Sequence, residues 1–203
     1  MSRRIWTHAV LVAVAIISMG SAGAARAQAT LGASFGYSHL SYTYDFDFSN
    51  NVIGIPNAED WGQPGLRIGY LFPGSEWAVN TDVGLFHRSG TVGPDVTSFE
   101  LLPQVQLSPW SRNGYSPFAS VGVGVEHETA PFGLSSVSAT RATFGGALGV
   151  RKGVSKNQGF LRAELRYDYL PKSEKVESSF TTAIFPETNE FSVRFGFDLA
   201  LSR

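Results

Sequence analysis

The stretch at residues 191–201 reads FSVRFGFDLAL and alternates without interruption between two chemical classes. Every odd-numbered position is apolar, whereas the even-numbered positions include Arg194 and Asp198. Successive side chains of a β-strand point to opposite faces, so this strand would have one continuously apolar face and one polar face. A soluble protein would need a core on the apolar side. We expect lipid there instead, which makes this strand part of a membrane barrel.

The first 27 residues have the parts of a secretory signal peptide. Two arginines near the N-terminus precede an apolar stretch at residues 5–17, and small residues with overlapping Ala-x-Ala sites follow. We expect cleavage after Ala27, with Ala29 as the second site, and the alternative is an uncleaved helix. The exported β-barrel domain would then comprise residues 28–203.

Composition limits the functions that the exported domain can have. Without the three arginines of residues 1–27, the 16 Lys and Arg residues fall to 13, against 17 Asp and Glu, and the formal charge becomes −4. This balance predicts no basic surface for nucleic acid. The chain has no cysteine, so neither a disulfide framework nor a thiolate metal site is expected.

Eight segments of the mature chain alternate in the way that strands do, and none has the ~18 consecutive apolar residues of a membrane helix. The connections after the first, third, fifth and seventh segments are longer than the others. An even number of strands of ~9–11 residues with long loops at one end predicts an all-β fold, an eight-stranded antiparallel up-and-down transmembrane β-barrel. The segments lie approximately at residues 31–39, 65–72, 77–88, 96–107, 117–126, 139–150, 160–170 and 191–201.

Some features depart from a regular barrel strand. The apolar residues change from odd to even positions between His39 and Leu40, which predicts a bulge or a strand end there. Pro103, inside the fourth segment, has no backbone N–H to donate to a neighbouring strand. Residues 41–61 are expected to form a large loop with room for a strand extension, and polar or charged loops are expected at 129–138 and 171–189.

The polar faces of the predicted strands would line the barrel interior, where small residues and paired charges fill the space that eight strands enclose. The alternative is a soluble, lipocalin-like barrel with these charges on its outside. Outward aromatic residues near strand ends are expected at the lipid–water boundary: Tyr70, Phe72, Trp77, Tyr167 and Tyr169. The predicted interior residues are Arg67, Asp82, Glu100, Gln104, Arg141, Arg162, Glu164, Arg166, Asp168, Arg194 and Asp198.

Four stretches carry a family resemblance: SPFASVGVGVE at 116–126, FGGALGVRKGV at 144–154, LRAELRYDYL at 161–170 and the final strand. With them the chain resembles the small OmpA/OmpX-like outer-membrane β-barrels of Gram-negative bacteria (outer membrane protein beta-barrel domain). The resemblance implies a monomer in the cell outer membrane, in contact with lipid and lipopolysaccharide.

The same resemblance implies recognition by the barrel-insertion machinery through a C-terminal signal. That signal maps onto Gly196, Leu199 and Leu201. Leu201 replaces the aromatic residue that usually ends the signal, and residues 202–203 follow it.

Some barrels of this size are lipid A deacylases that use a His-x-Ser pair and a carboxylate. His87 and Ser89 have this spacing, and Glu100 lies on the next predicted strand, but with inward parity. We therefore expect no catalytic residue. No cofactor-binding or metal site is expected either: the acidic residues Asp45, Asp47, Glu59 and Asp60 are interpreted as solvating the first loop.

The predicted role is non-enzymatic: a structural or surface-interaction protein of the cell envelope, whose loops 41–61 and 171–189 could meet an extracellular ligand. The family resemblance implies this role. The alternatives are a lipid A-modifying enzyme and a narrow, porin-like pore whose conductance would require rearrangement of the interior charges.

Overall fold

The computed structural model describes residues 28–43, 58–61, 64–72, 75–88, 96–110, 114–132, 135–154, 159–178 and 181–201. These residues form eleven β-strands. In this part of the chain no helix is long and apolar enough to cross a membrane. The predicted signal peptide at residues 1–27 lies outside the described residues.

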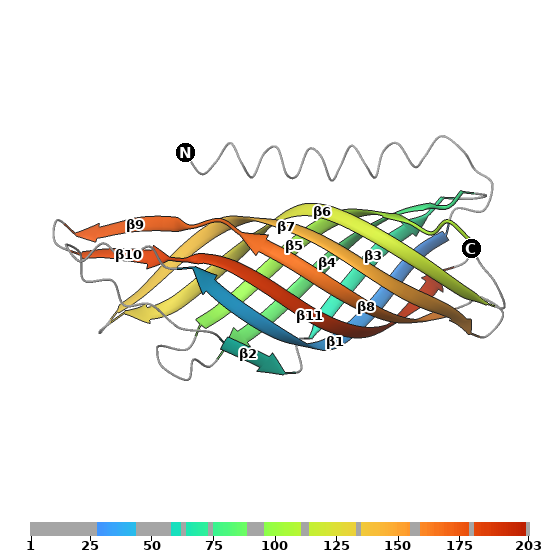
Figure 1. The fold of residues 1–203 in the computed structure, drawn as a ribbon, viewed down its shortest axis with the longest axis horizontal. Helices are drawn as coiled ribbons and strands as arrows, with labels where there is room; N and C mark the ends of the chain where they lie inside the picture. Colours follow the sequence, from blue (N-terminus) through green and yellow to red (C-terminus); the bar gives the residue numbers. More distant parts are fainter. Residues whose placement is uncertain are drawn as a thin grey trace.

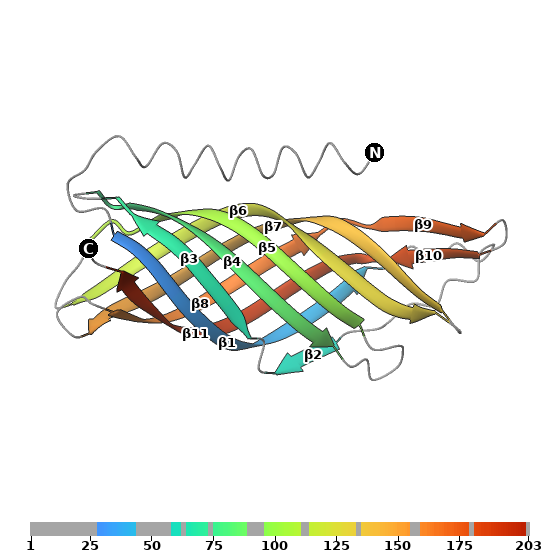
Figure 2. The same ribbon diagram turned by 180° about the vertical axis from the view of Figure 1, so that it is seen from behind.

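Eight antiparallel strands form the closed barrel that the sequence predicted (Figure 1). Each pairs with its neighbour in this set, and β11 returns to β1, so that these eight strands form a closed ring. Figure 2 shows the same strands from behind, with the same oblique tilt. The barrel strands are β1 (Gln28–Thr43), β3 (Gly65–Leu71), β4 (Trp77–Arg88), β5 (Val96–Leu107), β6 (Tyr115–Phe132), β7 (Ser135–Val154), β8 (Gly159–Leu170) and β11 (Glu187–Leu201).

Three short strands extend the barrel at the end where the longer loops lie. β2 (Ala58–Trp61) pairs with β1 beyond the part of β1 that pairs with β3. β9 (Ser173–Ser178) and β10 (Thr181–Phe185) form a separate hairpin, which projects past the loop-side end of the barrel (Figure 1). The strand extension expected within residues 41–61 is therefore present, and the predicted charged loop at 171–189 contains a hairpin and the start of β11.

The predicted irregularity at His39 and Leu40 is absent. β1 pairs with β11 in a single register from Ala29 to Thr43. Leu40 is fully buried, with 0% of its surface exposed, so it points into the barrel. The prediction was wrong because the interior holds apolar as well as polar side chains at this level, so an inward leucine resembles a change of face when only the sequence is considered.

The predicted loop at residues 129–138 is also mostly strand. β6 and β7 remain paired as far as Phe132 and Ser135, well beyond the ends expected from the hydrophobic pattern. The apolar alternation ends before the strands end, so the sequence pattern does not reveal their full length. The β6–β7 hairpin therefore continues past the apolar belt at the loop side.

Pro103 lies inside β5, as predicted, and interrupts pairing with β6. Leu101 pairs with Val125 and Gln104 with Gly122, whereas the two residues between them on β5 are unpaired. Proline has no N–H to donate, which explains the gap. The strands stay close there because Gly124 has no side chain: an added Cβ would collide with the Leu101 carbonyl.

The distribution of side chains is the reverse of that in a water-soluble barrel. Large apolar residues on the outer face of every barrel strand are exposed, and the inside is largely polar. The outer face of β11 carries Phe191, Phe195, Phe197, Leu199 and Leu201, all at least 40% exposed. Isolated exposed apolar residues are common in soluble proteins. A continuous belt of them indicates contact with a membrane or with another protein.

Candidate functional site

The charged interior is the most organised polar feature of the barrel. All eleven residues predicted to point inward are buried, which confirms the assignment of faces. They come from β3, β4, β5, β7, β8 and β11, because the strict alternation of each strand directs every second side chain inward.

Asp82 of β4 is the centre of this network. Arg67, directly opposite on β3, donates from Nε to Oδ1 at 2.5 Å and from Nη2 to Oδ2 at 2.7 Å. Gln104 of β5 donates from Nε2 to Oδ2 at 2.5 Å. Arg166 of β8 donates from Nη1 to the same oxygen at 2.6 Å. One carboxylate thus joins four strands, and two guanidinium groups compensate its charge.

Arg166 is the corresponding cationic centre and is 1% exposed. Besides Asp82, its Nη2 donates to Glu100 Oε1 at 3.0 Å, and its Nε donates to Asp168 Oδ2 at 2.6 Å. Glu100 lies on β5 and Asp168 on β8 itself, so the guanidinium group reaches across the lumen. Buried charge is tolerated at this position because each nitrogen of the guanidinium group donates to a carboxylate.

Two further groups of ion pairs flank this centre. Towards the turn-side end, Arg162 is 2.7 Å from Glu164 and 3.3 Å from Asp198, and Glu164 is also 3.3 Å from Arg67. The alternating charges of β8 therefore pair within the strand and with β11, as the sequence suggested.

Towards the loop side, Arg141 forms a 2.6 Å ion pair with Glu128. The same guanidinium group donates to the carbonyl oxygen of Pro186 at 2.6 Å and to Thr188 Oγ1 at 3.3 Å. Arg141 thus connects β7 with the start of β11 across the mouth of the barrel.

The interior also contains acidic residues that the prediction did not include: Glu126, Glu128 and Glu190. Among the described residues, five arginines and eight carboxylates are buried, which leaves the interior with an excess of acid groups. The alternation of the fifth predicted strand placed Glu126 on its inward face. Glu128 and Glu190 continue the inward alternation of β6 and β11, but lie just beyond the ends of the strands predicted at 117–126 and 191–201.

Some buried apolar residues share the loop-side part of the interior with these charges. Leu40, Phe86 and Leu170 lie near the loop-side ends of β1, β4 and β8, and each is at most 3% exposed. The Phe86 ring covers Gly84 and lies 5.8 Å from the Arg194 guanidinium carbon. Together with the ion pairs that cross the lumen, these side chains fill the barrel interior rather than line an open channel.

The structure separates the residues considered for deacylase chemistry. His87 is on the outer face, where its Nδ1 lies 3.3 Å from Thr97 Oγ1. Glu100 points inward to Arg166, on the other side of the barrel wall. Ser89 lies outside the described residues. A base oriented by this carboxylate is therefore not assembled.

Metal ligands are not grouped in the part of the chain that the structure describes: it contains no set of three or more His, Asp or Glu side chains that could hold an ion. His127, on the outer face, lies 2.9 Å from Thr140 Oγ1 through its Nδ1. Asp45 and Asp47 lie outside the described residues, as do the side chains of Glu59 and Asp60.

The outward aromatic residues lie near strand ends, as expected. Trp77 begins β4 at the turn side and is 50% exposed. Tyr70 and Phe72, also at the turn side, form an edge-to-face pair with ring centroids 5.2 Å apart. At the loop side, the Tyr167 hydroxyl donates to Asn189 Oδ1 at 2.5 Å. The aromatic residues thus mark both margins of the apolar belt.

Comparison with known proteins supports the fold. No protein-family model matches the sequence, and no curated protein matches it. The crystal structure of Neisserial surface protein A has a TM-score of 0.66 at 14% identity, over 85% of this chain and 97% of that chain. The outer membrane protein AlkL, determined in DMPC lipid bilayers, has a TM-score of 0.57 at 18% identity, over 90% and 95%.

The N-terminal β-barrel domain of Pseudomonas aeruginosa OprF has a TM-score of 0.53 at 15% identity, over 86% of this chain and all of that chain (100%). At such identities the likeness concerns the fold alone. The fold that these structures share with this chain is that of small outer-membrane β-barrels.

Proposed function

We propose that this chain is an OmpA/OmpX-like protein of a Gram-negative outer membrane, exported by a cleaved signal peptide. The observation that carries the proposal is the reversal of inside and outside: a belt of exposed apolar side chains surrounds a buried network of arginines and carboxylates. Such a belt is stable in lipid, where a closed barrel satisfies all its backbone hydrogen bonds internally.

The filled interior favours a role at the membrane surface over one in transport. Asp82, Arg166 and Glu100 connect walls that lie across the lumen from one another, and solutes would have to break these ion pairs to pass. What remains for contact with the surroundings is the loop-side end, where β2 and the β9–β10 hairpin extend from the barrel. We propose a monomeric, non-enzymatic protein that acts through these extensions and the loops at 41–61 and 171–189.

The partners that fit this proposal are outer-membrane lipid and lipopolysaccharide around the belt and the barrel-insertion machinery during assembly. An extracellular ligand would bind at the loops. Gly196, Leu199 and Leu201 of β11 are the residues proposed for recognition during insertion. Because Leu201 is not aromatic, a Leu201→Phe variant should assemble at least as well as the unmodified chain.

Fractionation tests the location directly. The full-length gene is expressed in a Gram-negative host, and the protein is followed through separated inner and outer membranes. We expect it in the outer membrane, with an electrophoretic mobility that shifts on heating because the folded barrel resists detergent at room temperature. Recovery as a soluble periplasmic protein without a heat shift would support a lipocalin-like barrel and reject the proposal.

Mass spectrometry of lipid A tests the non-enzymatic role. Cells with and without the protein should contain lipid A with the same acyl chains. Loss of an acyl chain that depends on the protein, and that Ser89→Ala or His87→Ala abolishes, would show that the chain is an enzyme.

A further inference from the structure

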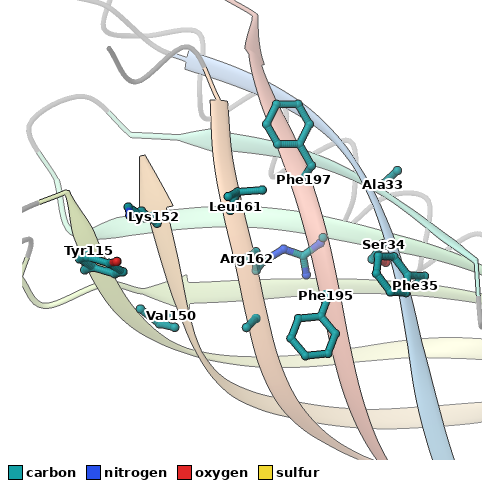
Figure 3. A pocket seen from close by; sticks show the side chains of 12 residues that line it. Ala33, Ser34, Phe35, Tyr115, Val150, Lys152, Leu161, Arg162, Phe195 and Phe197 are labelled. Atoms are coloured by element: carbon teal, nitrogen blue, oxygen red, sulfur yellow. The ribbon is translucent and has the colours of Figure 1, made fainter. Parts of the chain in front are cut away.

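A groove of about 610 Å³ opens on the outer face of the barrel, near its turn-side end (Figure 3). It crosses β1, β11, β8 and β7, which are consecutive neighbours in the closed sheet. Its volume is within the range of ~300–1,000 Å³ found for small-molecule sites. The apolar belt is therefore hollowed at one place.

The groove follows two neighbouring rows of outward side chains. Ala33 is the smallest residue of its row and stands next to Phe197, while Ala163 stands next to Phe195 in the second row. In each row, the small alanine side chain forms the floor of the groove and the neighbouring phenylalanine forms one of its sides. The first row is Ala33, Phe197, Leu161, Lys152 and Tyr115, and the second is Phe35, Phe195, Ala163 and Val150.

The first row ends in a charge. Lys152 is the only Lys or Arg at an outward-facing position of the barrel strands, within the residues that the structure describes. Its Nζ lies 4.8 Å from the centre of the Tyr115 ring, which holds the ammonium group at the turn-side end of the groove. A lysine can reach the lipid–water boundary from such a position by extending its apolar stem along the wall.

The groove is long enough for much of one lipid chain. From Ala33 to Lys152 the row crosses three strand spacings of ~4.8 Å, which is about 14 Å along the surface. Because the strands of such barrels tilt by ~35–45°, the row spans about 8–10 Å of the roughly 15 Å that one leaflet provides. Arg162 also lines the groove, but it is paired with Glu164 and Asp198, so Lys152 is the outward-facing cation there. An apolar slot that reaches this lysine complements a molecule with an acyl chain and an anionic headgroup.

We propose that the groove holds an acyl chain of a phospholipid from the turn-side leaflet, with the lipid phosphate at Lys152. The inference rests on the proposed membrane location. It assigns one retained lipid to a defined place, whereas the rest of the belt contacts exchanging lipid. Lipid A also has acyl chains and phosphates, but in a barrel oriented with its loops outside it occupies the opposite leaflet.

Two substitutions and two matched controls test the site. Ala163→Phe fills the groove, and Ala142→Phe adds the same ring to an outward position of β7 that does not line it. Lys152→Gln removes the charge at the groove, and Lys172→Gln removes a charge at the loop side. All four positions are exposed or half-buried on the outer surface, so the substitutions leave the interior ion pairs intact.

The measurement is native mass spectrometry of the detergent-extracted full-length protein, titrated with palmitoyl-oleoyl phosphatidylglycerol. We expect one retained lipid, weakened about fivefold by Lys152→Gln, the usual effect of one basic residue near anionic lipid. Ala163→Phe should abolish retention, and the two controls should leave it unchanged. Equal retention by Ala163→Phe and the unmodified protein would overturn the proposal, as would equal loss of retention in Ala142→Phe.

The heat-dependent mobility shift is recorded on the same samples. A sample that shifts but retains no lipid rejects only the lipid site. A sample that never enters the outer membrane rejects the proposed function itself, so the two failures are distinguishable.

Discussion

Arg166 of β8 and Asp82 of β4 meet across the barrel, with 2.6 Å between Nη1 and Oδ2. Three strands separate β8 from β4 in either direction around the closed sheet, so this hydrogen bond joins opposite walls. The two residues are 84 positions apart in the sequence, and the curvature of the closed sheet brings them together. The barrel architecture and the compensation of its buried charge therefore depend on each other.

Replacing Asp82 should destabilise the barrel strongly. Asp82→Ala removes the acceptor of Arg67, Gln104 and Arg166 and leaves two guanidinium groups with fewer partners. Removing one partner of a buried ion pair typically lowers the free energy of unfolding by about 3–5 kcal/mol. We expect a loss of this size in the free energy of unfolding, measured by urea titration in lipid vesicles with tryptophan fluorescence.

Asp198→Ala is the matched control for this variant. Asp198 accepts from Arg162 Nε at 3.3 Å, near the turn-side end of the barrel. Its loss should cost about 1.5–3 kcal/mol, the range for one hydrogen bond to a charged group. Equal losses for the two variants would contradict the central role of Asp82.

The assignment of faces could be predicted because it depends only on local alternation. In β11, Arg194 and Asp198 point inward and Phe195 and Phe197 point outward, as FSVRFGFDLAL predicted. Sequence reasoning found eleven members of the interior network but not Glu126, Glu128 and Glu190. It did not find Arg166 with Asp82 as partners, because that pairing depends on the tilt and offset of strands far apart in the chain.

The same reasoning failed where the environment of a face changes along a strand. The apolar residues from Leu40 onward suggested a change of face, but the loop-side interior holds apolar side chains beside its charges, and Leu40 is buried there. Glu128 was left out of the predicted interior because the fifth strand was expected to end at residue 126, although β6 continues to Phe132. Hydrophobic periodicity reports the extent of the lipid belt, and strands that continue beyond it are not detected.

The interior should not conduct ions in its resting form, and loss of Arg166 should change that. Arg166→Ala removes the contacts that connect β8 to Asp82 and Glu100, and it increases the excess of carboxylates. We expect planar-bilayer recordings of the unmodified barrel to show no steady current, and the variant to show discrete, cation-selective openings.

Arg151→Ala controls for the loss of a positive charge. Arg151 lies near the turn-side end of β7, with its guanidinium carbon 5.3 Å from the Phe160 ring centre. The variant should remain closed because it keeps the bridges to Asp82 and Glu100. Steady current through the unmodified barrel, or anion-selective openings in Arg166→Ala, would contradict the view that these bridges close the lumen.

Export should remove residues 1–27. The predicted cleavage site follows Ala27, so the mature protein should begin at Gln28, which is also the first residue of β1. Mass spectrometry of the purified protein should give the mass of residues 28–203. A protein that begins at Met1 would show that the N-terminal segment is retained, and Ala27→Leu should impair processing while Gln28→Asn should not.

A charge on the outer face distinguishes a lipid belt from a surface in water. Val121 is 70% exposed near the middle of β6, where a water-exposed valine could be replaced by arginine with a change within about 0.5 kcal/mol. On the lipid face of a barrel, arginine near the bilayer midplane costs about 2–4 kcal/mol, falling to about 0–1 near the boundary. We therefore expect Val121→Arg to lower the free energy of unfolding in lipid vesicles by about 2–4 kcal/mol.

His127→Arg, on the same face but nearer the loop side, is the control and should lower the free energy of unfolding by about 1 kcal/mol or less. If both variants unfold at the same urea concentration as the unmodified protein, the exposed belt does not face lipid.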